Sequence, residues 1–171
     1  MQWRRPVSRL ELVLALGLIA LLIGFALQRL GDLAVEAERI RLELSVRNME
    51  TGLRHHVAAR ILEGRLQELA AEEGANPVGR IVMPPPAYLG ELDHPDWKKI
   101  KGGSWYYDKQ DRVLVYRVVN EDRFVSPLPG RATFRLRVEY LDANGNGRRD
   151  PDERVEGLRL ERVAPYRWLD S

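Results

Sequence analysis

The stretch RRPVSRLELVLALGLIALLIGFAL, residues 4–27, decides the fold of this chain. From Leu12 to Leu27 it has no charged or strongly polar side chain, and with its flanks it offers about 20 residues, enough to cross a hydrocarbon core of ~30 Å. The run is long for the core of a secretory signal peptide, and no convincing small-residue cleavage site follows it. We therefore expect a retained membrane helix. The arginines before it should stay cytoplasmic, which leaves the chain after about Leu30 outside.

A carboxylate, Glu11, stands just inside the N-terminal edge of this apolar run. An ionised side chain costs roughly 2.5–3.5 kcal/mol at the centre of a membrane helix, so such residues usually have a function. A buried negative charge is tolerated only when it is paired. The alternative is that Glu11 lies at the headgroup level, hydrated or paired with Arg4 or Arg5.

The helical pattern continues beyond the membrane edge. Apolar residues recur at steps of mostly three to five residues, which predicts one stripe along a helix. The stripe consists of Leu33, Ile40, Leu44, Met49, Leu53, Val57, Ile61, Leu66 and Leu69. Gly74, followed by Asn76 and Pro77, is a plausible stop. We expect one helix from about residue 7 to residue 73, about 100 Å long at 1.5 Å per residue. Residues 1–30 hold the basic leader and the membrane half, and residues 31–73 the amphipathic half, which needs a partner.

That partner should be the extracytoplasmic part, residues 74–171. Its first stretch is rich in proline and glycine and predicts an irregular crossing loop. Four strand candidates follow, and their short turns and half-polar faces indicate an antiparallel sheet with one covered side. The candidates are residues 104–108, 112–119, 132–141 and 156–164, with Asp108 and Asp111 around the first turn. The expected fold class is α+β, a long N-terminal helix packed on a small antiparallel sheet.

Composition narrows the function classes. Charged residues make up 30% of the 171 residues, but the net charge is only +2, which argues against a nucleic-acid binder held by electrostatics. The chain has no cysteine, so disulfides and thiolate chemistry are excluded. No serine–histidine set, phosphate-binding glycine loop or pair of catalytic carboxylates stands out. We expect no enzyme.

The opening stretch resembles, without a gap, the leader of type IV pilins and of the pseudopilins of type II secretion. Arg4 and Arg5 match the basic leader, the triplet around Glu11 matches the family's glutamate, and the run to Leu27 matches its helix. The resemblance implies a filament subunit that meets other pilin or pseudopilin subunits and an assembly platform in the bacterial inner membrane. It also implies that Glu11 meets the N-terminal amine of a neighbouring subunit, and that cleavage falls between Pro6 and Val7.

The cleavage region departs from the family pattern. Pro6 stands where the family has glycine, Val7 where it usually has phenylalanine, and Arg9 where it has an apolar residue. Proline lacks the backbone freedom and the N–H of glycine, which argues against processing by prepilin peptidase. Without cleavage, Arg9 or an arginine of a neighbour would pair with Glu11. These departures favour a minor or non-standard subunit.

A second motif, DANGNGRRDPDE, occupies residues 142–153 and satisfies the twelve-residue calcium-loop rule. Ca²⁺ takes six to eight oxygen ligands, which the motif can supply. Gly147 stands at the position of the sharp turn in such a loop. The expected ligands are Asp142, Asn144, Asn146, the backbone carbonyl of Arg148, Asp150 and Glu153. The strand-like flanks resemble calcium loops between strands in bacterial surface proteins. We expect Ca²⁺ with weak affinity, roughly 10⁻⁴–10⁻³ M, because two arginines reduce the local negative field. The alternative is a solvated Asn-Gly hairpin turn.

The three histidines carry weaker signals. His55 and His56 are adjacent on the helix, so their side chains point about 100° apart and cannot chelate one metal. We expect both on a solvated surface. His94 lies in a loop where Asp93 and Asp96 could make a metal cluster, although a turn is the favoured interpretation.

The sequence therefore predicts a non-enzymatic pilin-like subunit, a minor pilin or pseudopilin. It would be held in the bacterial inner membrane by a single span with its N-terminus in the cytoplasm and its calcium-stabilised domain in the periplasm. The alternative is a permanently anchored, calcium-dependent binding or sensing module that does not polymerise.

Overall fold

The computed structural model describes residues 8–151 and 153–169. The chain forms two compact units that divide between Ala37 and Glu38. One α-helix, α1 (Arg9–Leu62), contributes residues to both. Each unit is described by itself below.

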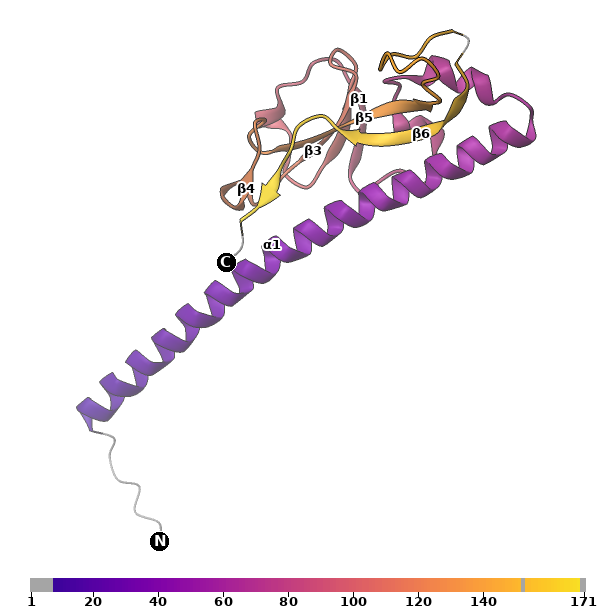
Figure 1. The fold of residues 1–171 in the computed structure, drawn as a ribbon. Helices are drawn as coiled ribbons and strands as arrows, with labels where there is room; N and C mark the ends of the chain where they lie inside the picture. Colours follow the sequence, from indigo (N-terminus) through magenta and orange to yellow (C-terminus); the bar gives the residue numbers. More distant parts are fainter. Residues whose placement is uncertain (1–7, 152, 170–171) are drawn as a thin grey trace. The chain divides into compact units, whose positions relative to one another are not determined.

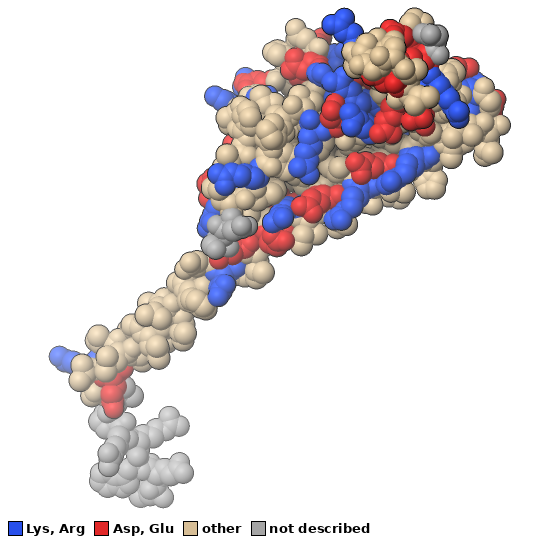
Figure 2. Space-filling view, viewed as in Figure 1, with Lys and Arg blue, Asp and Glu red and all other residues tan. Residues whose placement is uncertain are grey.

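The described residues of the first unit are those of α1 before Glu38, together with Ser8. The large apolar side chains from Leu10 to Leu30 are all exposed, and this stretch is long and apolar enough to cross a membrane. Figure 2 shows it almost free of charged atoms apart from its N-terminal end. The protein therefore has one long apolar N-terminal helix with the length and composition of a membrane anchor or a signal sequence.

The second unit packs the rest of α1 against a five-stranded sheet in the order β1-β2-β3-β5-β6 (Figure 1). All neighbouring pairs are antiparallel except β1 with β2. A two-stranded sheet joins β4 and β7. With η marking 3-10 helices, the elements after α1 are η1 (Leu66–Glu72), η2 (Pro77–Arg80), β1 (Tyr88–Leu92), η3 (Trp97–Lys99), β2 (Trp105–Asp108), β3 (Val113–Arg117), η4 (Glu121–Arg123), β4 (Phe124–Val125), β5 (Arg131–Tyr140), β6 (Val155–Arg162) and β7 (Arg167–Trp168).

The core lies between α1 and one face of the sheet. Leu42, Met49 and Leu53 of the helix are almost fully buried, and they belong to one cluster with the inward-facing residues of the strands. The alternation predicted for residues 132–141 is confirmed, since Phe134 and Leu136 are buried in this cluster. The expected fold class is confirmed as α+β with a mostly antiparallel sheet, a pilin-like architecture.

The buried stripe of α1 differs from the predicted one. Ile40 and Leu44 are about half exposed, whereas two polar residues, Glu38 and Ser45, lie on the buried face. Ser45 satisfies its hydroxyl within the helix by donating to the carbonyl of Arg41. A polar residue can occupy the buried face where its hydrogen bonds are made, which counting apolar positions does not detect.

The prediction that the helix runs to residue 73 is wrong. α1 ends at Leu62 because Gly64 has a φ of 71°, a left-handed conformation that glycine adopts without steric cost. Gly64 N donates to Ile61 O and Arg65 N to Arg60 O, the bond pattern of a Schellman helix end. The chain then turns into the 3-10 helix η1, which packs on β5 and β6.

The expected crossing loop contains a strand that the sequence did not reveal. β1 pairs in parallel with β2, and Leu92 lies opposite Asp108. Gly90 has a φ of 92°, and the register shifts between Tyr88 and Glu91, so the strand is irregular. This irregularity explains why no alternating pattern marks β1 in the sequence.

Candidate functional site

Glu11 takes part in a local hydrogen-bond pair at the start of α1. Ser8 N donates to Glu11 Oε2 at 2.8 Å, and Glu11 N donates to Ser8 Oγ at 3.1 Å. This reciprocal arrangement is a capping box, which satisfies two backbone donors that the first helical turn leaves free. Its signal, Ser-x-x-Glu before an apolar run, is readable in the sequence. Pro6 and Val7, the predicted cleavage point, lie outside the described residues.

The predicted calcium loop connects β5 and β6, and its polar side chains form one hydrogen-bonded ring. Asp142 accepts from the backbone N–H groups of Asn146 and Gly147 at 3.1 and 2.8 Å. Asp150 Oδ2 accepts from the side-chain amides of Asn144 and Asn146 at 2.6 and 2.8 Å. The expected side-chain ligands are thus gathered within one loop between strands.

Glu153 closes the ring. Its two carboxylate oxygens accept from Ala143 N and Asp150 N, both at 3.0 Å, and the residue is only 5% exposed. Gly145 and Gly147 have φ values of 70° and 72°, which gives the loop the sharp turns that a twelve-residue calcium loop needs. Arg148 N donates to Asn146 Oδ1 at 2.7 Å, a contact of its N–H and not of the carbonyl expected as a ligand. Carboxylate and amide oxygens are ligands that a hard cation accepts, and here they are occupied by N–H donors of the loop.

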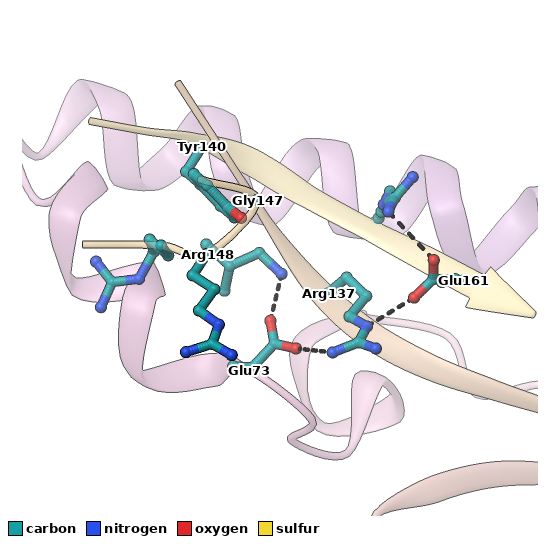
Figure 3. A pocket seen from close by; sticks show the side chains of 9 residues that line it. Glu73, Arg137, Tyr140, Gly147, Arg148 and Glu161 are labelled. Atoms are coloured by element: carbon teal, nitrogen blue, oxygen red, sulfur yellow. Dashed lines mark hydrogen bonds and ion pairs between the residues drawn. The ribbon is translucent and has the colours of Figure 1, made fainter. Parts of the chain in front are cut away.

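A charged cavity of about 470 Å³ lies beside this loop (Figure 3). Arg137 joins its two sides, with Nη1 2.8 Å from Glu73 Oε1 and Nε 2.6 Å from Glu161 Oε2. Hydrogen bonds from the Arg137 guanidinium lower the pKa of Glu161. Arg148 and Arg149 reach the cavity from the loop. None of the described residues that line it is a serine, cysteine or histidine, so its side chains offer charge pairing and no strong nucleophile.

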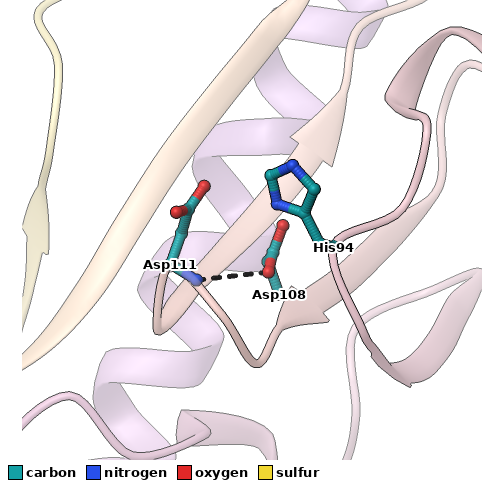
Figure 4. A group of neighbouring side chains, drawn as sticks. All are labelled: His94, Asp108 and Asp111. Atoms are coloured by element: carbon teal, nitrogen blue, oxygen red, sulfur yellow. Dashed lines mark hydrogen bonds between the residues drawn. The ribbon is translucent and has the colours of Figure 1, made fainter.

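A third group, His94, Asp108 and Asp111, could hold a metal ion (Figure 4). One ligand atom from each residue lies within 4.8 Å of the others. This group does not include Asp93 or Asp96, the two residues that the sequence offered as possible metal partners of His94. Asp96 instead caps η3, where its Oδ1 accepts from Lys98 N at 3.2 Å and its Oδ2 lies 3.4 Å from Lys99 Nζ.

The two helix histidines also differ from each other. His55 is exposed, as predicted, but His56 is partly buried and its Nε2 lies 3.1 Å from Glu72 Oε1. Arg80 Nε is 2.9 Å from the other oxygen of Glu72. The expectation of a solvated surface is therefore wrong for His56, because η1 and η2 fold back over this part of α1.

Comparison of the chain with protein-family models, curated proteins and solved structures returns no match. The functional interpretation therefore depends on the architecture and on the residues described above.

The sequence missed the cluster at His94 for a topological reason. Asp108 and Asp111 are visible as the ends of a tight turn between two predicted strands. What brings His94 to them is the parallel pairing of β1 with β2, since Leu92 lies opposite Asp108 and Lys109 N donates to Leu92 O. Without that pairing, the spacing of 14 residues between His94 and Asp108 gives no signal.

Proposed function

We propose that the protein is a non-enzymatic pilin-like subunit, a minor pilin or pseudopilin of a type IV pilus or type II secretion apparatus. The observation that supports this most is the single helix α1, whose N-terminal residues are apolar and exposed and whose remaining residues pack on a mostly antiparallel sheet. The subunit sits in the bacterial inner membrane as a single span, with its N-terminus cytoplasmic and the second unit periplasmic. Arg9 before the run and the arginines of the leader support this orientation.

The mechanism is association of apolar helices. In a filament, the exposed apolar residues of α1 pack against those of other subunits, while the sheet faces outward. Glu11 then needs a cation of a neighbour, because a carboxylate in an apolar bundle is costly unless it is paired. Such a pair favours one axial register over others.

We also propose that Ca²⁺ binds the loop at residues 142–153. The ring formed by Asp142, Asn144, Asn146, Asp150 and Glu153 supports this assignment, because it gathers oxygen ligands at the positions that the calcium-loop rule requires. The ion would draw the amide and carboxylate oxygens of the ring to itself. Arg148 and Arg149 keep the affinity weak.

The filament role is tested by separating the charge of Glu11 from its capping contact. Glu11→Gln keeps a side chain able to complete the capping box but removes the negative charge. We expect E11Q to abolish incorporation into filaments sheared from cells, with membrane insertion unchanged. Ser8→Ala is the control, since it removes the cap and leaves the charge, and it should still be incorporated. Normal incorporation of E11Q contradicts the register role of Glu11.

The second candidate, a permanently anchored calcium-dependent binding or sensing module, is favoured by Pro6 at the predicted cleavage point. The mature N-terminus distinguishes the two. Mass analysis that finds Val7 as the first residue supports a processed pilin-like subunit. An intact Met1, together with absence from sheared filaments, supports the anchored module.

A further inference from the structure

We propose that His94, Asp108 and Asp111 bind a divalent transition-metal ion, with Zn²⁺ as the best fit, and that this ion joins the loop after β1 to the β2–β3 turn. The proposal does not depend on the filament role or on the calcium loop. It uses different residues at a different place in the second unit.

Asp108 is the residue that points to a ligand. It is only 6% exposed, and its Oδ1 accepts from Gln110 N at 3.0 Å and from Asp111 N at 3.3 Å. These bonds fix the carboxylate within the turn. No residue that the structure describes donates a hydrogen bond to Oδ2, and Figure 4 shows this oxygen on the side of the imidazole of His94. The two backbone donors thus leave Oδ2 free to accept, and a bound cation can use its lone pairs.

The other two ligands reach the same space from exposed positions. His94 has a φ of 45°, which turns the chain back after β1, and Asp111 follows Asp108 by three residues across the turn. The guanidinium of Arg135 is directed to the backbone carbonyl of Asp111, with Nη2 at 3.1 Å. The two carboxylates together carry a charge that a divalent ion neutralises.

The donor set selects the class of metal. Ca²⁺ takes six to eight oxygen ligands and Mg²⁺ keeps several waters, so neither favours a site with an imidazole. One imidazole nitrogen with carboxylate oxygens suits Zn²⁺, which binds three protein ligands and keeps a fourth position open. The ligand atoms, now up to 4.8 Å apart, would move closer on binding. Carboxylate Oδ1 of Asp108 is already oriented by two N–H donors, as outer hydrogen bonds commonly do for metal ligands.

The effect of the ion follows from the topology. β1 is an edge strand with an irregular register, and it leads into the loop that carries His94. A metal held between this loop and the β2–β3 turn ties the end of β1 to the centre of the sheet. Zn²⁺ should therefore stabilise the folded protein, since it binds the folded state alone.

The test uses the full-length chain in detergent micelles, without a polyhistidine tag, titrated with Zn²⁺ against a chromophoric chelator. We expect one equivalent to bind and the melting temperature to rise. His94→Gln and Asp111→Asn should each weaken binding at least about tenfold. Both residues are exposed, and circular dichroism confirms that the variants fold. Two controls keep wild-type zinc binding, His55→Gln at an exposed helix histidine and Glu153→Gln in the calcium loop.

Several results would overturn the proposal. These are no zinc binding by the wild type, equal affinity in wild type and either ligand variant, or loss of binding in H55Q or E153Q. A calcium titration of H94Q separates this site from the loop, because calcium binding at residues 142–153 should be unchanged in that variant.

Discussion

At the scale of the residue, Glu38 is the first buried side chain of α1 among the described residues, and it is 4% exposed. Its carboxylate accepts from Tyr116 Oη at 3.0 Å, Val119 N at 2.6 Å, and both the backbone and side-chain nitrogens of Asn120 at 2.9 and 2.6 Å. Burial, with a further contribution from this carboxylate, raises the pKa of Tyr116. Glu38 thus fixes α1 to the chain that follows β3.

We predict that Glu38→Ala lowers the free energy of unfolding by about 2–4 kcal/mol, because it leaves several buried donors without an acceptor. The matched control is Glu43→Ala on the same helix. Glu43 forms only partly exposed ion pairs with Arg39 and Arg47, so its loss should cost less than about 1 kcal/mol. Thermal melting of the full-length chain in micelles measures both. Equal effects of the two substitutions would contradict the structural role of Glu38.

The residue scale also marks a limit of sequence reasoning. Leu53 and Met49 were correctly expected on the buried face, because their spacing follows the helical period. Glu38 was not expected on the buried face, because its burial depends on hydrogen-bond donors of Tyr116 and Asn120, about 80 residues later in the chain. A hydrogen-bonded polar residue in a core carries no periodic signal of its own.

At the scale of the element, the end of α1 depends on one glycine. Gly64 adopts the left-handed conformation that completes the Schellman end, and Arg65 pairs with Glu63 and Glu68 just beyond it. The direction in which η1 leaves the helix follows from this turn. Because η1 packs on β5 and β6, the turn also determines how the sheet is covered.

We predict that Gly64→Ala destabilises the protein by about 1–2 kcal/mol, the cost of a side chain in the left-handed region. Asn tolerates this region better, so Gly64→Asn should recover part of the loss. Thermal melting in parallel with the wild type gives the comparison. If G64A and wild type melt at the same temperature, the glycine is not what ends the helix.

Among the elements, the strands with regular alternation were predictable and the others were not. β5 and β6 alternate buried and exposed residues, and β2 and β3 flank a short turn, so all four were found within a few residues. β1, with Gly90 at positive φ, and the two-residue strands β4 and β7 lack such a pattern. These three strands form because of tertiary contacts, which the spacing of residues in the sequence does not reveal.

At the scale of the whole molecule, the loop at residues 142–153 connects β5 to the edge strand β6. We predict that 5 mM Ca²⁺ stabilises the protein by about 1–2 kcal/mol, as expected for a dissociation constant of roughly 10⁻⁴–10⁻³ M. The melting temperature should rise by about 2–8 °C, and EDTA should reverse the change.

Glu153→Gln removes the charge of the ligand that closes the loop, and we expect this variant to lose the calcium-dependent rise. Glu156→Gln, at an exposed position in β6, is the matched control and should respond as the wild type does. A calcium response that survives in E153Q, or that is absent from the wild type, would leave the hairpin turn as the better interpretation.

The candidate sites were predictable to different degrees. The loop at residues 142–153 is contiguous, so its spacing alone identified the side chains that the structure gathers into a ring. The cluster of His94 with Asp108 and Asp111 comes from two segments that parallel strand pairing brings together. No rule on residue spacing predicts that pairing. Glu11 was singled out for its charge, and its capping contact with Ser8 was missed although the Ser-x-x-Glu motif marks it in the sequence.

The continuity of α1 has a mechanical consequence. A pull on the apolar N-terminal residues is carried along the helix, and the first side chain that resists it in the second unit is Glu38. The four hydrogen bonds of that carboxylate would then share the load. We therefore expect Glu38→Ala to lower the force at which the second unit unfolds when it is pulled from its N-terminal helix.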